Sequence, residues 1–392
     1  MNIKHPIVCA GVSLVVGCSG GKSDSPAAAT DTQDTQEPQD DTQDSGEAGP
    51  DWDAILASIG TTVAMPRFGD MVTTAESLSS ASQAFCAAPD AAGLEATQTA
   101  WHAVMEVWKQ GEPAQFGPVW NEPWRVGPKL DFWPARPSNI ESVLAADYAV
   151  DAEAVSMMGT VTRGLPVLDW ILFEPGADTL AAFTDTTTGA RRCDYLVGLT
   201  GDVHNLMQIQ HDVWSPDGED WLANYTSPGP STDLMSTRDT MDEVVNRTIF
   251  AVENVRTLKL GKPAGQDSGG TPQPDLLESP QSGRGIQNAL DVLQGVEDTV
   301  LGDYGGVDGL GLLDAIPDDD KRASISADFA RTHAAAVEAV AAIPAPLSET
   351  IFTDPVVIDT ATSAVRDLQV VLQVDLAQAL SVTIRFNDTD GD

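Results

Sequence analysis

Apolar residues recur at intervals of three and four along most of the chain. The clearest run lies in 355–381, with Val357, Ala361, Ala364, Leu368, Leu372, Leu376 and Ala379. This spacing gathers apolar side chains on one face of an α-helix. Segment 237–260 repeats it, and so does 321–343, with Ile325, Phe329, Val337 and Val340. Few segments show the strict alternation that is typical of a half-buried strand.

The same reasoning predicts further helices at 67–87, 92–110, 138–147, 151–159, 166–173, 190–214 and 284–301. Loops rich in Gly, Pro and Asp separate the helices, at 111–137, 215–232, 261–283 and 302–318. We therefore expect an all-α protein built from two antiparallel helical bundles. The boundary is placed near 215–232, between an N-terminal bundle at 51–220 and a C-terminal bundle at 221–392.

The first residues follow a different pattern. One lysine precedes an apolar run from Pro6 to Val16, which is too short for a stable membrane-spanning helix and is typical of a secretory signal. The run ends in Gly17-Cys18, the small residue and cysteine that a lipoprotein signal peptidase requires. We predict a signal peptide at 1–17 and lipid attachment at Cys18. Ser19 favours the outer membrane of a two-membrane bacterium, where acyl chains such as palmitate would anchor the protein.

Residues 18–50 repeat Asp-Thr-Gln and contain no aromatic residue. Such a segment buries too little apolar surface to offset its ordering entropy, so we predict a disordered, acidic tether. It accounts for a minor part of the net charge of −38. The body is therefore strongly acidic itself, which argues against nucleic acid or anionic lipid as a partner of the body.

Four cysteines occur in the chain. Cys9 leaves with the signal and Cys18 carries lipid, which leaves Cys86 and Cys193 in an oxidising compartment. We predict a disulfide between them, since two thiols so far apart in sequence make a poor zinc motif.

Common catalytic motifs are missing: the sequence has no His-Glu-x-x-His, Gly-x-Ser-x-Gly, P-loop or dinucleotide-binding glycine motif. His333 shares an apolar face with Phe329 and Val337 and is interpreted as a core residue. His204 and His211 stand seven apart on one helix, about 10 Å, too far to hold one ion without other ligands. His102 is interpreted as structural.

The most unusual segment is Gly164-Leu-Pro-Val-Leu-Asp169-Trp-Ile-Leu-Phe173. Pro166 belongs in the first turn of a helix, and Asp169 then lies near the helix N-terminus, where free N–H groups and the dipole favour a carboxylate. Glu278-Ser-Pro-Gln-Ser-Gly-Arg284 precedes another helix and is interpreted as a cap. Each feature alone has a structural explanation, but they occur together.

Taken together, these segments resemble the imelysin-like family of bacterial envelope proteins over roughly 54–392. The matching segments, in order, are Trp101 to Trp108 leading to Phe116-Gly-Pro-Val119, Phe132-Trp-Pro134, Gly164 to Phe173, Arg192-Cys193, Leu260-Gly-Lys-Pro-Ala-Gly265, Ser279 to Arg284, and Phe386-Asn-Asp-Thr-Asp-Gly-Asp392. The resemblance implies two helical-bundle halves with a site where they meet, a link to iron uptake, and a founding member described as a metallopeptidase.

The chain departs from the family's Gly-x-His-x-x-Glu signature. Gly164 matches, but Pro166 stands where His belongs and Asp169 where Glu belongs. Proline has no side-chain ligand or proton to offer, and aspartate reaches one methylene less far. A metal site built on that motif would lose half its local ligands, so we favour a function without catalysis over a catalytic one.

Three functions remain open. We favour a non-catalytic binding lipoprotein that captures iron, an iron complex or another ligand in a cleft between the bundles, with an envelope transport system as partner. The residues expected at this cleft are Gly164, Asp169, Ser282, Arg284, Asn387 and Asp390. There Asp169 would accept hydrogen bonds or coordinate a metal, Arg284 would clamp an anionic group, and the C-terminal tail would close over the site.

The alternatives are a peptidase that depends on a divalent metal and a structural envelope protein. The peptidase needs a polarised water and a base beside its metal, and no three-ligand set is recognisable in the sequence. The structural protein would use the tryptophans of the 111–137 loop to contact a partner.

Overall fold

Helices make up the regular structure of this protein. A computed structural model describes residues 50–174, 178–230 and 232–385, and in these ranges it contains one isolated bridge, between Tyr304 and Val307, but no strand. The all-α prediction is confirmed. The predicted signal peptide, Cys18 and all of the tether before Pro50 lie outside the described residues.

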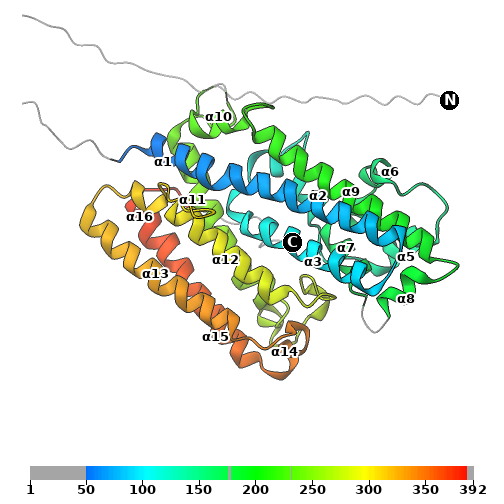
Figure 1. Cartoon of the computed structure of the whole chain (residues 1–392). Coiled ribbons are helices and arrows are strands. Elements are labelled where there is room, and N and C mark those ends of the chain that lie inside the picture. The colour runs from blue at the N-terminus through cyan, green and yellow to red at the C-terminus, as the bar shows by residue number, and fades with distance from the viewer. Residues whose placement is uncertain (1–49, 175–177, 231, 386–392) are drawn as a thin grey trace, which may run out of the picture. The chain divides into compact units, whose positions relative to one another are not determined.

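The N-terminal helices pack around α2 (Met65–Ala87). The chain enters it through α1 (Trp52–Ser58) and a π-helical segment, Ile59–Ala64, and α2 then contacts both α3 (Ala91–Gln110) and α9 (Gly189–Trp214) (Figure 1). A short turn joins α2 to α3, and the carboxylate of Asp90 caps α3 by accepting the N–H of Gly93 at 2.7 Å.

Shorter helices connect the long ones. They are α4 (Val126–Leu130), α5 (Pro137–Ala145), α6 (Ala152–Ser156), α7 (Leu165–Leu172), α8 (Thr179–Thr184), α10 (Trp221–Thr226) and α14 (Leu347–Thr353). The sequence predicts α5, α6 and α7, but not α1, α4, α8, α10 or α14. Helices of five to seven residues make at most two turns, which offers few apolar positions for recognition; α6, with five residues, lies within the predicted range 151–159.

The C-terminal helices are α11 (Thr237–Asn254), α12 (Gly285–Leu301), α13 (Asp319–Ala341) and α15 (Pro355–Val370), with α13 packed on both α12 and α15. The predicted helices at 237–260 and 355–381 are confirmed, but part of each is a π-helix and not an α-helix. π-Helical segments, Val255–Gly261 and Val371–Leu376, continue α11 and α15, and the latter leads into α16 (Ala377–Ala379). A repeat of 3.6 residues does not reveal this local widening.

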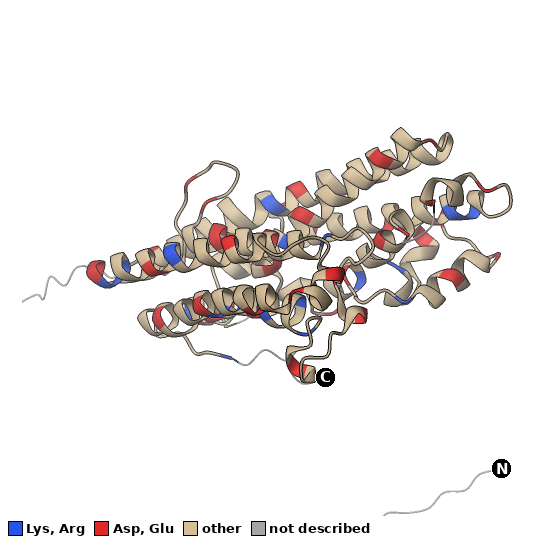
Figure 2. Ribbon diagram, turned by 90° about the horizontal axis from the view of Figure 1, so that it is seen from below, with Lys and Arg blue, Asp and Glu red and all other residues tan. Residues whose placement is uncertain are grey.

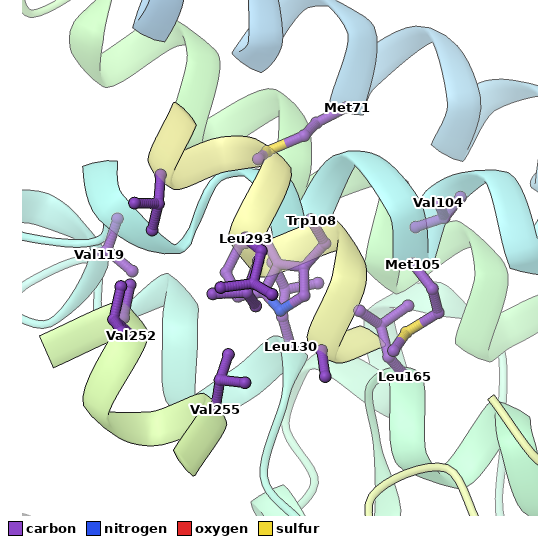
Figure 3. Packing of buried hydrophobic residues seen from close by; sticks show 14 of the residues in the cluster. Met71, Val104, Met105, Trp108, Val119, Leu130, Leu165, Val252, Val255 and Leu293 are labelled. Atoms are coloured by element: carbon purple, nitrogen blue, oxygen red, sulfur yellow. The ribbon is translucent and has the colours of Figure 1, made fainter. Parts of the chain in front are cut away.

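One hydrophobic core runs through both sets of helices. Figure 3 shows Trp108 of α3 beside Leu293 of α12, with Val255 close by. At the crossing of α3 and α12, a Cβ added to Gly295 would lie 1.9 Å from the carbonyl oxygen of Gln110, so only glycine permits this approach. The described residues from Pro50 onward belong to one compact unit. The boundary between two bundles near 215–232 stays a prediction.

Acidic residues are spread along the helices of this unit and outnumber basic ones (Figure 2). None of the described helices combines the length and the apolar character that crossing a bilayer requires. His333 is a core residue, as predicted: its side chain is buried and its Nε2 lies 3.0 Å from the carbonyl oxygen of Leu293.

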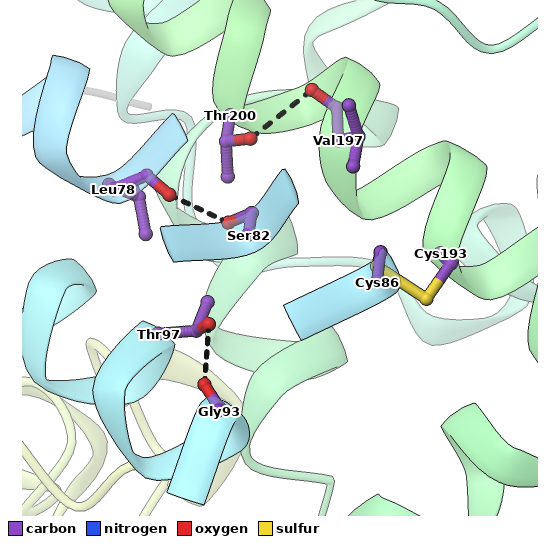
Figure 4. The surroundings of a disulfide bond; sticks show 8 residues. All are labelled: Leu78, Ser82, Cys86, Gly93, Thr97, Cys193, Val197 and Thr200. Carbon is purple, nitrogen blue, oxygen red and sulfur yellow. Dashed lines mark hydrogen bonds between the residues drawn. A yellow bond between two sulfur atoms is a disulfide. The ribbon is translucent and has the colours of Figure 1, made fainter. Parts of the chain in front are cut away.

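The predicted disulfide is confirmed. Cys86, near the end of α2, is bonded to Cys193 of α9, with their Cα atoms 5.4 Å apart (Figure 4). The bond closes a loop with a sequence separation of 107 residues. It ties together two helices that already share an extensive interface.

Reduction of this disulfide is expected to lower the free energy of unfolding by about 4–5 kcal/mol, because the unfolded chain regains the entropy of the opened loop. Urea unfolding with and without a reductant measures the change. The double variant Cys86→Ser/Cys193→Ser should show the lower stability in both conditions. Equal stability of the oxidised and reduced wild-type protein would contradict the expectation.

Candidate functional site

A pocket of about 470 Å³ opens where three segments meet: residues 133–138, the first turns of α7, and the loop 274–281. Tryptophan and proline side chains supply much of its wall. The lining residues are Trp133, Pro134, Ala135, Arg136, Pro137, Ser138, Pro166, Asp169, Trp170, Pro274, Asp275, Leu277, Ser279, Pro280 and Gln281. We call this pocket the cleft. Its volume is in the range of sites for small organic ligands.

Gly164 sets the position of α7 at one side of the cleft. Its φ is +84°, and a Cβ there would lie 2.4 Å from the carbonyl oxygen of Leu130. Both conditions restrict the position to glycine. Pro166 follows in the first turn of α7, where its fixed φ is compatible with a helix and its ring lines the cleft.

Asp169 links α7 to the loop 277–282. Its Oδ2 accepts the backbone N–H of Gln281 and its Oδ1 that of Ser282, each at 3.1 Å. The residue is 2% exposed. Burial raises the pKa of Asp169 to about 6, although these hydrogen bonds oppose the increase. The sequence places this carboxylate near the free N–H groups of its own helix, but the hydrogen bonds come from another segment.

A buried ion-pair network holds the same loop from the other side. Glu278, 3% exposed, pairs with Lys109 of α3 and lies 3.1 Å from Nζ of Lys259. Burial alone would raise the pKa of Glu278, but the two lysines outweigh it and hold the pKa below its usual range. An anion buried with two cations is stable only while both remain in place.

Two further carboxylates complete the network. Asp131 pairs with Lys109 and accepts the indole N–H of Trp108 at 2.9 Å, while Glu112 lies 2.8 Å from Nζ of Lys259. Burial opposes the charge of Lys109, yet these carboxylates and Glu278 hold its pKa well above the usual range. The network therefore connects α3, the segment after α4, the π-helical end of α11 and the loop.

Arg284 lies at the start of α12 and faces Asp291, one oxygen of which is 2.6 Å from its Nη2. Gln287 donates to the other oxygen of Asp291 at 2.9 Å. Burial raises the pKa of Asp291 to about 6 against the effect of Arg284. Burial and the charge of Arg284 lower the pKa of His102, whose ring meets Trp101 edge-on and lies tilted against Phe173.

The structure brings some of the predicted site residues together. Asp169 lines the cleft, and Ser282 is bonded to it through the backbone, with Gly164 at the start of the same helix. Arg284 is not among the lining residues and pairs with Asp291 instead. Asn387 and Asp390 lie outside the described residues.

Several residues that build the site were not among the predicted site residues. Trp133, Pro274 and Gln281 line the cleft, and Lys109, Lys259 and Glu278 fix its loop. Glu278 was noticed only as part of a helix cap. A buried Lys–Glu pair joins residues far apart in sequence, so no local sequence pattern predicts it. In the 111–137 loop, Trp120 is 44% exposed and Trp124 is half-buried, whereas Trp133 faces the cleft.

The residues present do not fit a metal centre at Asp169. Both of its oxygens accept backbone N–H groups, and Pro166 offers no ligand. Across the described ranges, no group of three or more His, Cys, Asp or Glu side chains is arranged to hold a metal ion. His211 lies beside Asp212, with 3.2 Å between Nδ1 and Oδ1, on the exposed surface of α9.

Comparisons with known proteins agree with this architecture. A family model described as Imelysin matches residues 64–374. Iron-regulated protein A of Synechococcus elongatus is 25% identical over 220 residues, which is 55% of each protein, so the match spans about half of that relative.

Two solved structures share the fold. A protein described as an iron-regulated protein A precursor from Parabacteroides distasonis has a TM-score of 0.71 at 20% identity, with 85% of this chain and 96% of that chain covered. An imelysin-like protein from Psychrobacter arcticum has a TM-score of 0.70 at 14% identity, with 86% and 100% covered.

The raised pKa of Asp169 predicts a pH-dependent stability. Because the folded state binds this proton more tightly than the unfolded state, the stabilisation is complete below pH 3.8 and is lost as the pH rises through about 6. Relative to Asp169→Asn, the wild-type protein should lose up to about 3 kcal/mol between pH 4 and 7.5. Urea unfolding of both proteins across this range measures the difference.

Glu338→Gln, which removes an exposed carboxylate of α13 away from the cleft, is the matched control for the loss of one negative charge. A wild-type minus Asp169→Asn difference that does not change with pH would contradict the assignment.

Proposed function

This chain belongs to the imelysin family, and from that premise we propose that it is a non-catalytic binding protein of the bacterial cell envelope that takes up an iron complex. The observation that carries the proposal is the cleft itself. It has the volume of a small-ligand site, largely tryptophan and proline walls, and one buried carboxylate. It also has a rigidly held rim, because Asp169 and the network around Glu278 fix the loop from two sides.

The support for iron comes from the names of proteins that are similar to this chain. Two proteins similar to this chain carry the name iron-regulated protein A, one of them a curated relative. The cleft offers apolar surfaces and one engaged carboxylate, which suit an organic ligand better than a bare cation. Iron would therefore arrive inside a chelate that supplies its own donor atoms.

The predicted lipid anchor supports a location of the protein in the cell envelope. A lipid at Cys18 and an acidic tether would hold the body outside the cytoplasm, and family members are generally extracytoplasmic. A binding protein in the envelope could collect a chelate there and pass it to a transport system. No observation favours the peptidase, because Pro166 replaces the signature histidine and the donors around Asp169 do not fit a metal.

The proposal predicts that filling the cleft strongly reduces iron retention. Ser138 is exposed at the rim, so Ser138→Trp should block the cleft without disturbing the core. The purified protein is incubated with medium from an iron-limited bacterial culture to which ferric iron has been added, and is then re-isolated without chelators. Elemental analysis should find iron with the wild-type protein and roughly tenfold less with Ser138→Trp.

Ser324→Trp, at an exposed serine of α13, is the matched control and should retain iron like the wild type. Failure of the wild-type protein to retain iron would overturn the iron-binding function. Equal retention by Ser138→Trp would overturn the assignment to the cleft.

A further inference from the structure

The charges and rings of the cleft indicate which ligands it accepts. We propose that the cleft selects a chelate with a positively charged ammonium group on an apolar body, and discriminates against anionic chelates. This inference rests on the proposed function and names the chemical class of its ligand. It follows from the walls, from the charged groups at the cleft and from the field of the whole chain.

The walls supply surfaces that attract a cation. Trp133 and Trp170 both line the cleft, and indole is the aromatic ring that binds cations most strongly. Trp170 is buried and already has a cation partner, the guanidinium carbon of Arg192 at 5.5 Å from its ring centroid, so the half-buried Trp133 is the ring more available to a ligand. Prolines at 134, 137, 166, 274 and 280 complete an apolar surface for the ligand body.

The charged residues that line the cleft are two carboxylates and one arginine, and they differ in how deeply they are buried. Asp169 lies buried at the wall, and Asp275 is an exposed carboxylate at the rim. The one cation among the lining residues is Arg136, which is also exposed. A buried charge acts through a lower dielectric than an exposed one, so Asp169 contributes most to the local potential. An ammonium group would therefore bind near Asp169, with the body against the tryptophans.

Pro166 shapes this preference further. It lines the cleft in the first turn of α7, three residues before Asp169. An imidazole there could accept a proton and attract anions, or ligate a metal, whereas the proline ring does neither. Helix α7 contains no basic residue, so Asp169 has no cationic neighbour from its own helix.

The field of the whole molecule acts in the same direction. Acidic side chains number 59 and basic ones 21, and Figure 2 shows the acidic residues along most helices. Such a field raises the local concentration of cations and lowers that of anions, with a strong dependence on salt. A triply negative chelate would be repelled before it reached the cleft.

Three probes test the inference by isothermal titration at low salt. They are a ferric trihydroxamate with one pendant ammonium group, the same chelate with that amine acetylated, and a triply negative ferric tris-catecholate. The acetylated form keeps the size and the iron shell but lacks the charge. The ammonium chelate should bind about tenfold more tightly than the acetylated one, and the catecholate most weakly.

Two exposed residues allow matched variants that should fold normally. Asp275→Asn should weaken the ammonium chelate several-fold and leave the acetylated one unchanged, whereas Arg136→Gln should strengthen it by a similar factor. Arg322→Gln, at a surface cation of α13 outside the cleft, should change neither affinity. Asp169→Asn should remove most of the preference for the ammonium group.

The outcomes separate this inference from the proposed function. Equal affinity for the ammonium and acetylated forms, or tightest binding of the catecholate, would overturn the charge selectivity and leave an iron-chelate-binding cleft standing. If none of the probes binds while the wild-type protein retains iron from culture medium in a cleft-dependent way, the selectivity is again overturned. If iron retention also fails, the proposed function fails with it.

Discussion

The burial of Glu278 between Lys109 and Lys259 is the constraint on which the cleft depends. A carboxylate in the interior is stable only with its cations in place, so the loop that carries it cannot move without separating charges. Helix α3 supplies one lysine and the π-helical end of α11 the other, which makes the loop a junction between the N-terminal and C-terminal helices. Asp169 then fixes the next turn of the loop through two backbone N–H groups.

This arrangement explains why the cleft has rigid walls and few polar side chains that are free to take part in a reaction. Polar groups near the cleft are already engaged with one another: Asp169 with the loop, Arg284 with Asp291, Lys109 with three carboxylates. What faces the open volume is mainly tryptophan and proline, with the exposed Asp275 and Arg136 at the rim. Such a surface suits selective binding, and Pro166 adds no side-chain ligand or titratable group to it.

The sequence predicts the long helices well, because each repeats an apolar stripe over several turns, as 321–343 does for α13. It also predicts the Cys86–Cys193 bond by elimination among four cysteines. It places Asp169 correctly on a helix but not its partners, since the N–H groups of Gln281 and Ser282 come from more than 100 residues away. Short helices such as α4 and the network around Glu278 have no local signature, because their stability comes from tertiary contacts.

Backbone hydrogen exchange at Gln281 and Ser282 tests the central claim, that the Glu278 network positions the loop at the cleft. Both amides should exchange slowly in the wild-type protein and much faster in Lys109→Met, by a larger factor than the amides of α13. The matched control is Arg67→Met, which breaks a buried pair with Asp298 near the other end of α12 and should leave these two amides protected. Unchanged protection of Gln281 and Ser282 in Lys109→Met, or equal acceleration in both variants, would contradict the account.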